Sequence, residues 1–162
     1  MKKILLHTGE YTLVDDKDFG WLNQWKWYKS TNGYALRNIH KKIGFKQYKN
    51  IHIRMHRLII DAPKNKFTDH INHNKLDNRR SNLRTVNKSQ NEHNTDKRRN
   101  NTTGYLGVFK GRNKYMARIT INGKHIYGGF FKDVKEAALA RDKIALKYHG
   151  EFARLNFPKG TI

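Results

Sequence analysis

Cysteine is absent from this chain of 162 residues. Without thiols the chain has neither a disulfide framework nor a thiolate zinc site, which fits a reducing compartment. Long apolar runs are missing too, because the run near the start, Ile4–Leu6, is too short for a signal peptide and no stretch could span a bilayer. We therefore expect no membrane partner and a cytoplasmic location.

Acidic residues are also scarce, since 13 aspartates and glutamates stand against 34 lysines and arginines, for a net charge of +21. Solubility alone needs a charge of only about 2–8 in a small domain. Basic residues outnumber acidic ones in residues 1–100 and again in residues 101–162. Binding to phosphates releases counterions, so nucleic acid, rather than a small-molecule substrate, is the expected partner.

The N-terminal part, residues 1 to about 62, is aromatic and basic, with the alternation of short strands at 11–14 and 34–38. Asn32-Gly33 is a hairpin turn signal. Three nearby tryptophans could stack on bases, but large aromatic side chains also dominate the core of a small domain, and we favour a core. A β-rich N-terminal region is therefore expected.

The middle part, residues 63–96, alternates between apolar segments and a polar loop. Strands are expected at 67–71 and 83–86, joined by the loop 72–82, and Asn87 could cap a following short helix. Residues 97–103 then form a basic, polar linker.

The C-terminal part, residues 104–162, predicts a three-stranded antiparallel sheet packed on one helix. Tyr115–Ile121 alternates, Asn122-Gly123 forms a tight turn, and Lys124–Phe131 returns as the partner strand. Asp133 caps a helix that stops at Gly150 and has an apolar stripe of Ala137, Ala140, Ile144 and Tyr148. The whole chain is thus predicted to be α+β.

The second face of this sheet is free and basic, and a ribbon of that width fits the major groove of duplex DNA. The linker lysine and arginines contact phosphates or belong to a solvated hinge. The candidate DNA-binding residues are Lys97, Arg98, Arg99, Lys110, Arg112, Lys114, Arg118, Thr120, Lys124, His125 and Tyr127.

Four side chains of the middle part offer what phosphodiester hydrolysis requires. His70 is a candidate general base, because imidazole titrates near neutral pH, and the Asn82 oxygen could fix its tautomer. Asp69 and Asn91 offer hard oxygens to one divalent cation, Mg²⁺ or Mn²⁺. Neighbours on a regular strand point to opposite faces, so the strand must end, twist or bulge at Asp69-His70.

The run MHRLI, then DHINHNKLDNRRSNLR, then Asn91 resembles the HNH nucleases of the phage homing-endonuclease type. Their active site is a ββα-metal finger, and the resemblance places it at about residues 66–95 of a nuclease domain spanning 1–96. It implies Asp69 and Asn91 as metal ligands, His70 as general base and Asn82 as the residue that orients it. Family members often have glycine where His73 stands, and histidine tolerates a left-handed backbone better than most residues. A phage gene expressed in a bacterial host is implied.

Residues 104–158 are similar to the plant ethylene-response (Apetala-two) DNA-binding domain. The similarity is carried by GYLGV, KYMARITINGKHIYGGFF and EAALARDKIALKYHGEFARLNFP. Arginines that read bases in that family fall at Leu106 and Phe109 here. The resemblance therefore implies the docking mode more than the target sequence.

Together these features predict a metal-dependent, site-directed DNA endonuclease, with double-stranded DNA as its partner. One finger per chain predicts that a monomer cuts one strand of the DNA, and a dimer is kept as the alternative oligomeric state. The alternatives are a non-catalytic, sequence-specific DNA-binding regulator with a vestigial nuclease finger, and an RNA-binding or RNA-cutting protein. The deep, narrow major groove of A-form RNA disfavours the last of these.

Overall fold

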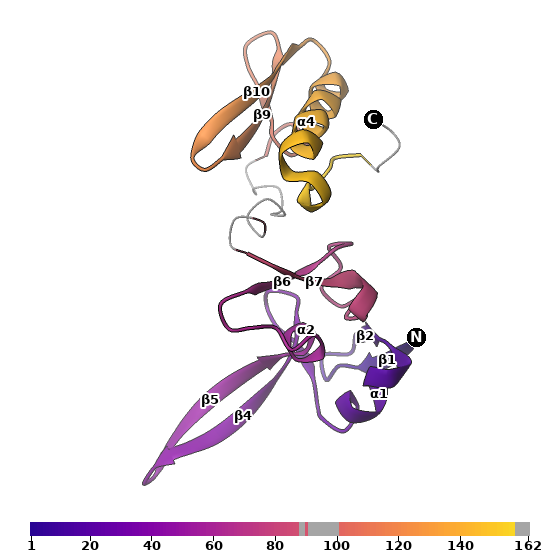
Figure 1. The fold of residues 1–162 in the computed structure, drawn as a ribbon, viewed down its shortest axis with the longest axis vertical. Coiled ribbons are helices and arrows are strands. Elements are labelled where there is room, and N and C mark those ends of the chain that lie inside the picture. Colours follow the sequence, from indigo (N-terminus) through magenta and orange to yellow (C-terminus); the bar gives the residue numbers. More distant parts are fainter. Residues whose placement is uncertain (88–89, 91–100, 158–162) are drawn as a thin grey trace. The chain divides into compact units, whose positions relative to one another are not determined.

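A computed structural model describes residues 1–87, 90 and 101–157, and the chain forms two compact units that divide between Asn87 and Lys88 (Figure 1). Helices mix with small antiparallel sheets, as the α+β prediction expects. Most of the predicted linker, residues 97–103, lies outside the described residues. No helix in the described ranges is both long and apolar enough to cross a bilayer.

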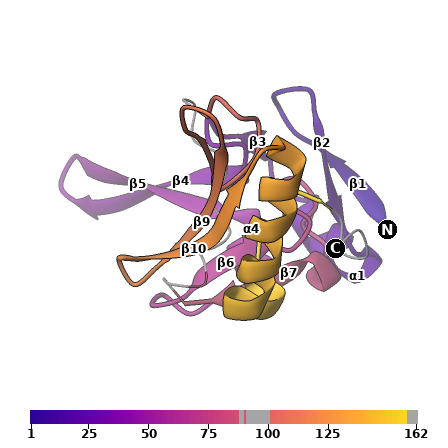
Figure 2. The same cartoon turned by 90° about the horizontal axis from the view of Figure 1, so that it is seen from above.

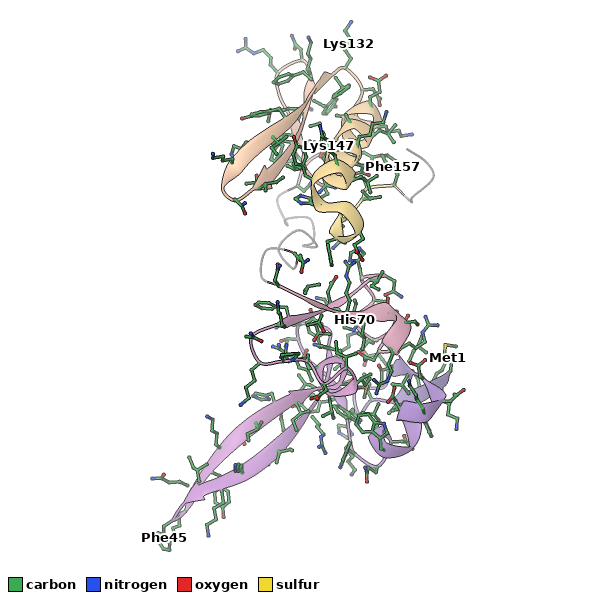
Figure 3. All side chains as sticks on the ribbon, in the orientation of Figure 1. Met1, Phe45, His70, Lys132, Lys147 and Phe157 are labelled. Atoms are coloured by element: carbon green, nitrogen blue, oxygen red, sulfur yellow. The ribbon has the colours of Figure 1, made fainter. Side chains whose placement is uncertain are left out.

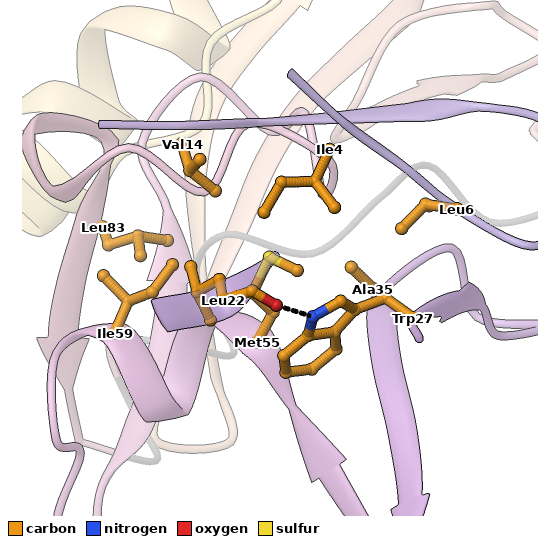
Figure 4. Close-up of a cluster of buried hydrophobic side chains, with 9 residues drawn as sticks. All are labelled: Ile4, Leu6, Val14, Leu22, Trp27, Ala35, Met55, Ile59 and Leu83. Carbon is orange, nitrogen blue, oxygen red and sulfur yellow. Dashed lines mark hydrogen bonds between the residues drawn. The ribbon is translucent and has the colours of Figure 1, made fainter. Parts of the chain in front are cut away.

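The N-terminal unit is built on a small hydrophobic core that contains one buried tryptophan. Strands β1 (Lys2–Leu5) and β2 (Tyr11–Val14) pair antiparallel, and helix α1 (Asp16–Leu22) follows. Trp27 is almost fully buried, and its indole nitrogen donates to the Leu22 carbonyl at 2.9 Å (Figure 4). The predicted tryptophan core is confirmed, because Trp21 and Trp25 pack against the same cluster. The buried members are Ile4, Leu6, Val14, Leu22, Trp27, Ala35, Met55, Ile59 and Leu83.

A long hairpin follows the short strand β3 (Tyr28–Lys29). Strands β4 (Ala35–Gly44) and β5 (Gln47–Arg54) pair antiparallel over most of their length and project away from the rest of the unit (Figure 1). The strand predicted at 34–38 corresponds only to the first residues of β4, which continues to Gly44. Both faces of the outer hairpin are exposed, so its sequence lacks the alternation that marks a half-buried strand.

The middle segment provides the two strands of the predicted finger. Helix α2 (Met55–Ile59) leads to β6 (Phe67–His70), which pairs antiparallel with β7 (Leu83–Val86). A polar loop joins them and ends in the 3₁₀ turn η1 (Arg80–Asn82). The helix predicted after Asn87 lies almost wholly outside the described residues.

The C-terminal unit has the predicted sheet and helix. Strands β8 (Val108–Lys110), β9 (Tyr115–Ile121) and β10 (Lys124–Phe131) form an antiparallel sheet. Helix α4 (Val134–His149) lies along one face of that sheet (Figure 2). The predicted cap is confirmed, because the Asp133 side chain accepts from the backbone nitrogens of Lys135 and Glu136.

The buried stripe of α4 differs from the apolar one that we expected. Tyr148 is exposed, whereas Arg141, Asp142 and His149 are buried together with Ala137, Ala138 and Ala145. The reason is the chain that follows the short 3₁₀ turn η2 (Gly150–Phe152). Asp142 accepts from the backbone nitrogens of Asn156 and Phe157 there, so a polar cluster lies where apolar side chains were predicted.

Candidate active site

The strand β6 ends at His70, so Asp69 and His70 are its last two residues. Both side chains are buried, with 9% and 4% of their surface exposed, although they are neighbours in sequence. The chain turns directly afterwards, because the His73 nitrogen bonds to the His70 carbonyl and the Ile71 nitrogen bonds to the Asn82 carbonyl. Asp69 and His70 both still pair in register with β7, so their sharing of one site stays a prediction.

The His70 ring is held by Asn78 rather than by Asn82. His70 Nε2 lies 3.1 Å from Asn78 Oδ1, and an amide oxygen only accepts, so Nε2 carries the proton and Nδ1 is the basic nitrogen. Asn78 is fully buried, and its amide nitrogen donates to the Thr12 hydroxyl at 2.7 Å. Asn78 was not predicted from the sequence, since its only signal there is its place in the same asparagine-rich loop.

Asn82 instead braces the finger loop. Its Oδ1 accepts from the Asn72 backbone nitrogen at 2.9 Å, and its Nδ2 donates to the Asp77 carbonyl at 2.8 Å. The hydrogen bond expected between His70 and Asn82 is therefore replaced, within the described residues, by one between His70 and Asn78. Asn82 is 6% exposed, and the oxygen and the nitrogen of its amide group both hydrogen-bond to the loop backbone. These two bonds hold the ends of the loop together.

The same loop is tied to strand β2. The Leu13 backbone nitrogen donates to the Leu76 carbonyl and the Asn78 nitrogen donates to the Leu13 carbonyl, both at 2.8 Å. Asp77 pairs with Arg79, which lowers the pKa of the Asp77 carboxyl group. His73 has a φ of 63°, the left-handed backbone that the resemblance suggested at this position. The loop is thus a braced element whose shape fixes Asn78.

Burial lowers the pKa of His70, and this keeps its ring neutral. The hydrogen bond that His70 donates to Asn78 and the charges of Asp69 and Asp77 raise the pKa and offset part of this lowering. A neutral imidazole is the form that accepts a proton. The Asp69 charge acts on the ring, so the carboxylate and the imidazole belong to one electrostatic environment.

Two further rings pack against His70. The His56 ring lies edge-on to it, with centroids 5.2 Å apart, and the Tyr34 ring is 5.9 Å away. Burial, with smaller effects of His70 and two arginines, lowers the pKa of His56 to about 3. His56 is buried, and its Nδ1 has no hydrogen-bond partner within the described structure.

Asp69 is the carboxylate that the sequence predicts as a metal ligand. Arg84, directly opposite on β7, holds its Oδ2 through Nε at 2.9 Å and through a terminal nitrogen at 2.8 Å. The other proposed ligand, Asn91, lies outside the described residues. Within the described ranges, no group of three or more histidines and acids could hold a metal. A carboxylate oxygen suits Mg²⁺ or Mn²⁺, so the donor type fits and the described part supplies one such ligand.

The predicted DNA-binding residues of the C-terminal unit lie on and around one sheet face. Arg118 is directly opposite Tyr127, and Thr120 is opposite His125, to which it hydrogen-bonds at 3.0 Å. The basic side chains at the strand ends and turns are exposed, namely those of Lys110, Arg112, Lys114 and Lys124. Lys97, Arg98 and Arg99 lie outside the described residues.

The aromatic part of that face, Phe109 and Phe130, was not predicted from the sequence. Phe109 is paired with Met116, and Met116 with Phe130, so all three side chains lie on the same face as Arg118. The Arg118 guanidinium lies 4.3 Å from the centre of the Phe109 ring. Extending the alternation of β9 to its neighbouring strands would have found them.

Comparison with known proteins now decides the family. Residues 61–93 match the family model of the HNH endonucleases, and this stretch contains Asp69, His70, Asn82 and Asn91. Over 151 residues the chain is 30% identical to an uncharacterized HNH endonuclease of Acanthamoeba polyphaga mimivirus, covering 91% of this chain and 75% of the relative. The chain belongs to the HNH endonucleases. This HNH endonuclease is thus an enzyme that hydrolyses DNA, and HNH nucleases generally use a divalent metal ion.

Proposed function

We propose that this HNH endonuclease is a site-directed, homing-type enzyme that nicks one DNA strand with His70 as general base and one divalent cation. The observation that carries the proposal is the His70 ring, buried at the end of β6 and fixed by Asn78 beside Asp69. A base has to be neutral and correctly oriented before substrate arrives, and this environment supplies both conditions.

Each residue of the finger has one role in this scheme. His70 Nδ1 takes a proton from the attacking water, while Asn78 keeps the other ring nitrogen protonated. Asn82 holds the loop that carries Asn78, so it acts on the base indirectly. Asp69 and Asn91 would hold Mg²⁺ or Mn²⁺. When bound, such a cation relieves charge on the phosphate and helps the leaving oxygen.

The C-terminal unit is proposed to position the enzyme as an Apetala-two-like DNA-binding domain. Support comes from the sheet face opposite α4, where Arg118, Thr120, His125 and Tyr127 lie together. A β-ribbon of this kind enters the major groove, and the surrounding lysines and arginines contact phosphates. The base-reading arginines of the plant family are absent, so a different target sequence is proposed.

One finger per chain supports a single cut per binding event. A monomer is therefore proposed to release nicked DNA, and the resemblance to phage enzymes supports action in the cytoplasm of a bacterial host.

Relaxation of supercoiled plasmid tests this proposal. With Mg²⁺ or Mn²⁺ we expect open circles to form before linear molecules, and with EDTA no cutting. Asp69→Ala should abolish cutting yet keep the Kd for duplex DNA within about threefold, because one carboxylate contributes little to a charge-driven affinity. Cutting that continues in EDTA would contradict the metal requirement, and linear DNA as the first product would contradict nicking.

A further inference from the structure

The hairpin of β4 and β5 is an arm without a core of its own. From Asn38 to His52 every residue except Gly44 is exposed, and Phe45 marks the far tip (Figure 3). A two-stranded ribbon without a buried face is marginally stable in water. The N-terminal core uses only the base of the hairpin, through Ala35 and Ile53. Folding of the unit therefore gives no reason for the arm's length.

The arm is strongly and uniformly positive. Residues 35–54 contain six lysines and arginines and no acidic residue. Lys41 is directly opposite Lys49, so two like charges face each other on the same side of the ribbon. Such a pair destabilises the free hairpin, and a phosphate bound between the two ammonium groups would relieve the repulsion.

The pairing register gives the arm two different faces. One face has polar groups of the kind that read base edges, since Asn38 is opposite His52 and His40 is opposite Asn50. His52 Nδ1 donates to Asn38 Oδ1 at 2.6 Å. This bond leaves the amide hydrogens of Asn38 as donors and His52 Nε2 as an acceptor on the exposed face.

The end of the arm is apolar as well as basic. Phe45 is 85% exposed, Tyr48 65% and Ile43 58%. Exposed apolar groups clustered in this way mark an interaction site, and aromatic rings stack on bases.

We propose that the β4–β5 hairpin is a second DNA-reading element that enters the major groove beside the cut site. The six residues from Ile39 to Gly44 span about 20 Å at roughly 3.3 Å per residue. The groove is about 12 Å wide and 8.5 Å deep and admits a two-stranded ribbon, so the arm has sufficient reach. Asn38, His40 and Asn50 face the bases, and Lys41 and Lys49 contact the backbone. The inference rests on DNA as the substrate and not on the proposed metal chemistry.

Shortening the arm is the direct test. Replacing residues 40–50 by Asn-Gly joins Ile39 to Ile51, which are directly opposite each other, and leaves the core residues in place. With a 30-base-pair duplex containing the mapped cut site, in EDTA, we expect the Kd to rise at least tenfold while the Tm stays close to that of the wild type. In Mg²⁺ the shortened enzyme should still nick plasmid, but at more scattered positions.

Two double variants of the full-length chain, each losing two charges, test the proposal without shortening the arm. Lys41→Gln/Lys49→Gln removes two charges from the arm, and Lys17→Gln/Lys26→Gln removes two from exposed positions elsewhere in the same unit. Only the first pair should reduce the slope of log K against log salt concentration by about 1.8, because each phosphate contact contributes about 0.9.

The outcomes separate the arm from the active site. Unchanged Kd and unchanged cut positions in the shortened enzyme would overturn the proposal, as would equal slopes for the two lysine pairs. A wild-type dimer that becomes monomeric on shortening, with DNA affinity unaffected, would assign the arm to a second copy instead. Failure of the metal-dependent nicking scheme would leave the comparison of the two lysine pairs in EDTA untouched, because their salt dependence can be measured on any 30-base-pair duplex.

Discussion

At the scale of single residues, the site depends on histidines kept neutral by burial. His70 and His56 lie edge-on to each other, and the pKa of each is lowered first by loss of solvent. Two protonated rings in contact would repel each other. A lowered pKa therefore keeps His70, the proposed base, ready to accept a proton and keeps His56 uncharged.

This arrangement predicts that stability depends on pH. The folded pKa of His56, about 3, lies below its ordinary value of 6.5, so the unfolded chain binds the proton first. The stability from a neutral His56 is fully present above pH 6.5 and is lost as the pH falls toward 3. Each pH unit in this window costs about 1.4 kcal/mol for one such histidine.

Urea unfolding between pH 6 and pH 4 measures this loss. His56→Phe, which retains a packed ring but cannot titrate, should reduce the pH dependence by about 1.4 kcal/mol per pH unit. His7→Gln, at an exposed histidine of the same unit, is the control and should leave the slope unchanged. Equal slopes for wild type and His56→Phe would show that His56 is not protected from protons.

At the scale of elements, the finger loop assigns different tasks to two asparagines. The Asn78 side chain hydrogen-bonds to the His70 ring, whereas the hydrogen bonds that the structure describes for the Asn82 side chain go to the backbone of the loop. Substituting aspartate, which has nearly the same shape as asparagine, at each of the two positions separates these tasks. Asn78→Asp places a negative charge about 3 Å from the imidazole and should raise the pKa of His70 by about one unit or more.

The pH dependence of kcat/KM for nicking reads out the difference. With Asn78→Asp, its acid limb should move to higher pH by about one unit. Asn82→Asp should leave the limb in place but lower the free energy of unfolding by about 1–3 kcal/mol, because the Asp77 carbonyl loses its buried donor. An acid limb that moves with Asn82→Asp and not with Asn78→Asp would return the orienting role to Asn82.

Elements with one buried and one exposed face could be predicted from sequence, and others could not. The alternation of Tyr115–Ile121 and the Asn122-Gly123 turn located β9 and β10. The β4–β5 arm has no buried face, so no alternation marks it. Asn78 and Asp142 were missed because their partners, Thr12 and the chain at Asn156, are distant in sequence and only folding brings them together.

At the scale of the whole molecule, binding and cutting depend on different features. Positive charge is spread over both units, so affinity for DNA does not depend on any one side chain. Hydrolysis, in the proposed scheme, depends on the imidazole of His70. A single substitution should therefore remove the reaction and leave the complex with DNA intact.

The most direct measurement is the nicking rate of His70→Ala on supercoiled plasmid in Mg²⁺, beside its Kd for the same DNA in EDTA. With His7→Ala as the control, we predict a rate at least about 100-fold below that of the wild type, since a general base contributes 10²–10⁴-fold. The Kd should stay within about threefold. Nicking by His70→Ala at the wild-type rate would contradict the assignment of His70 as the base.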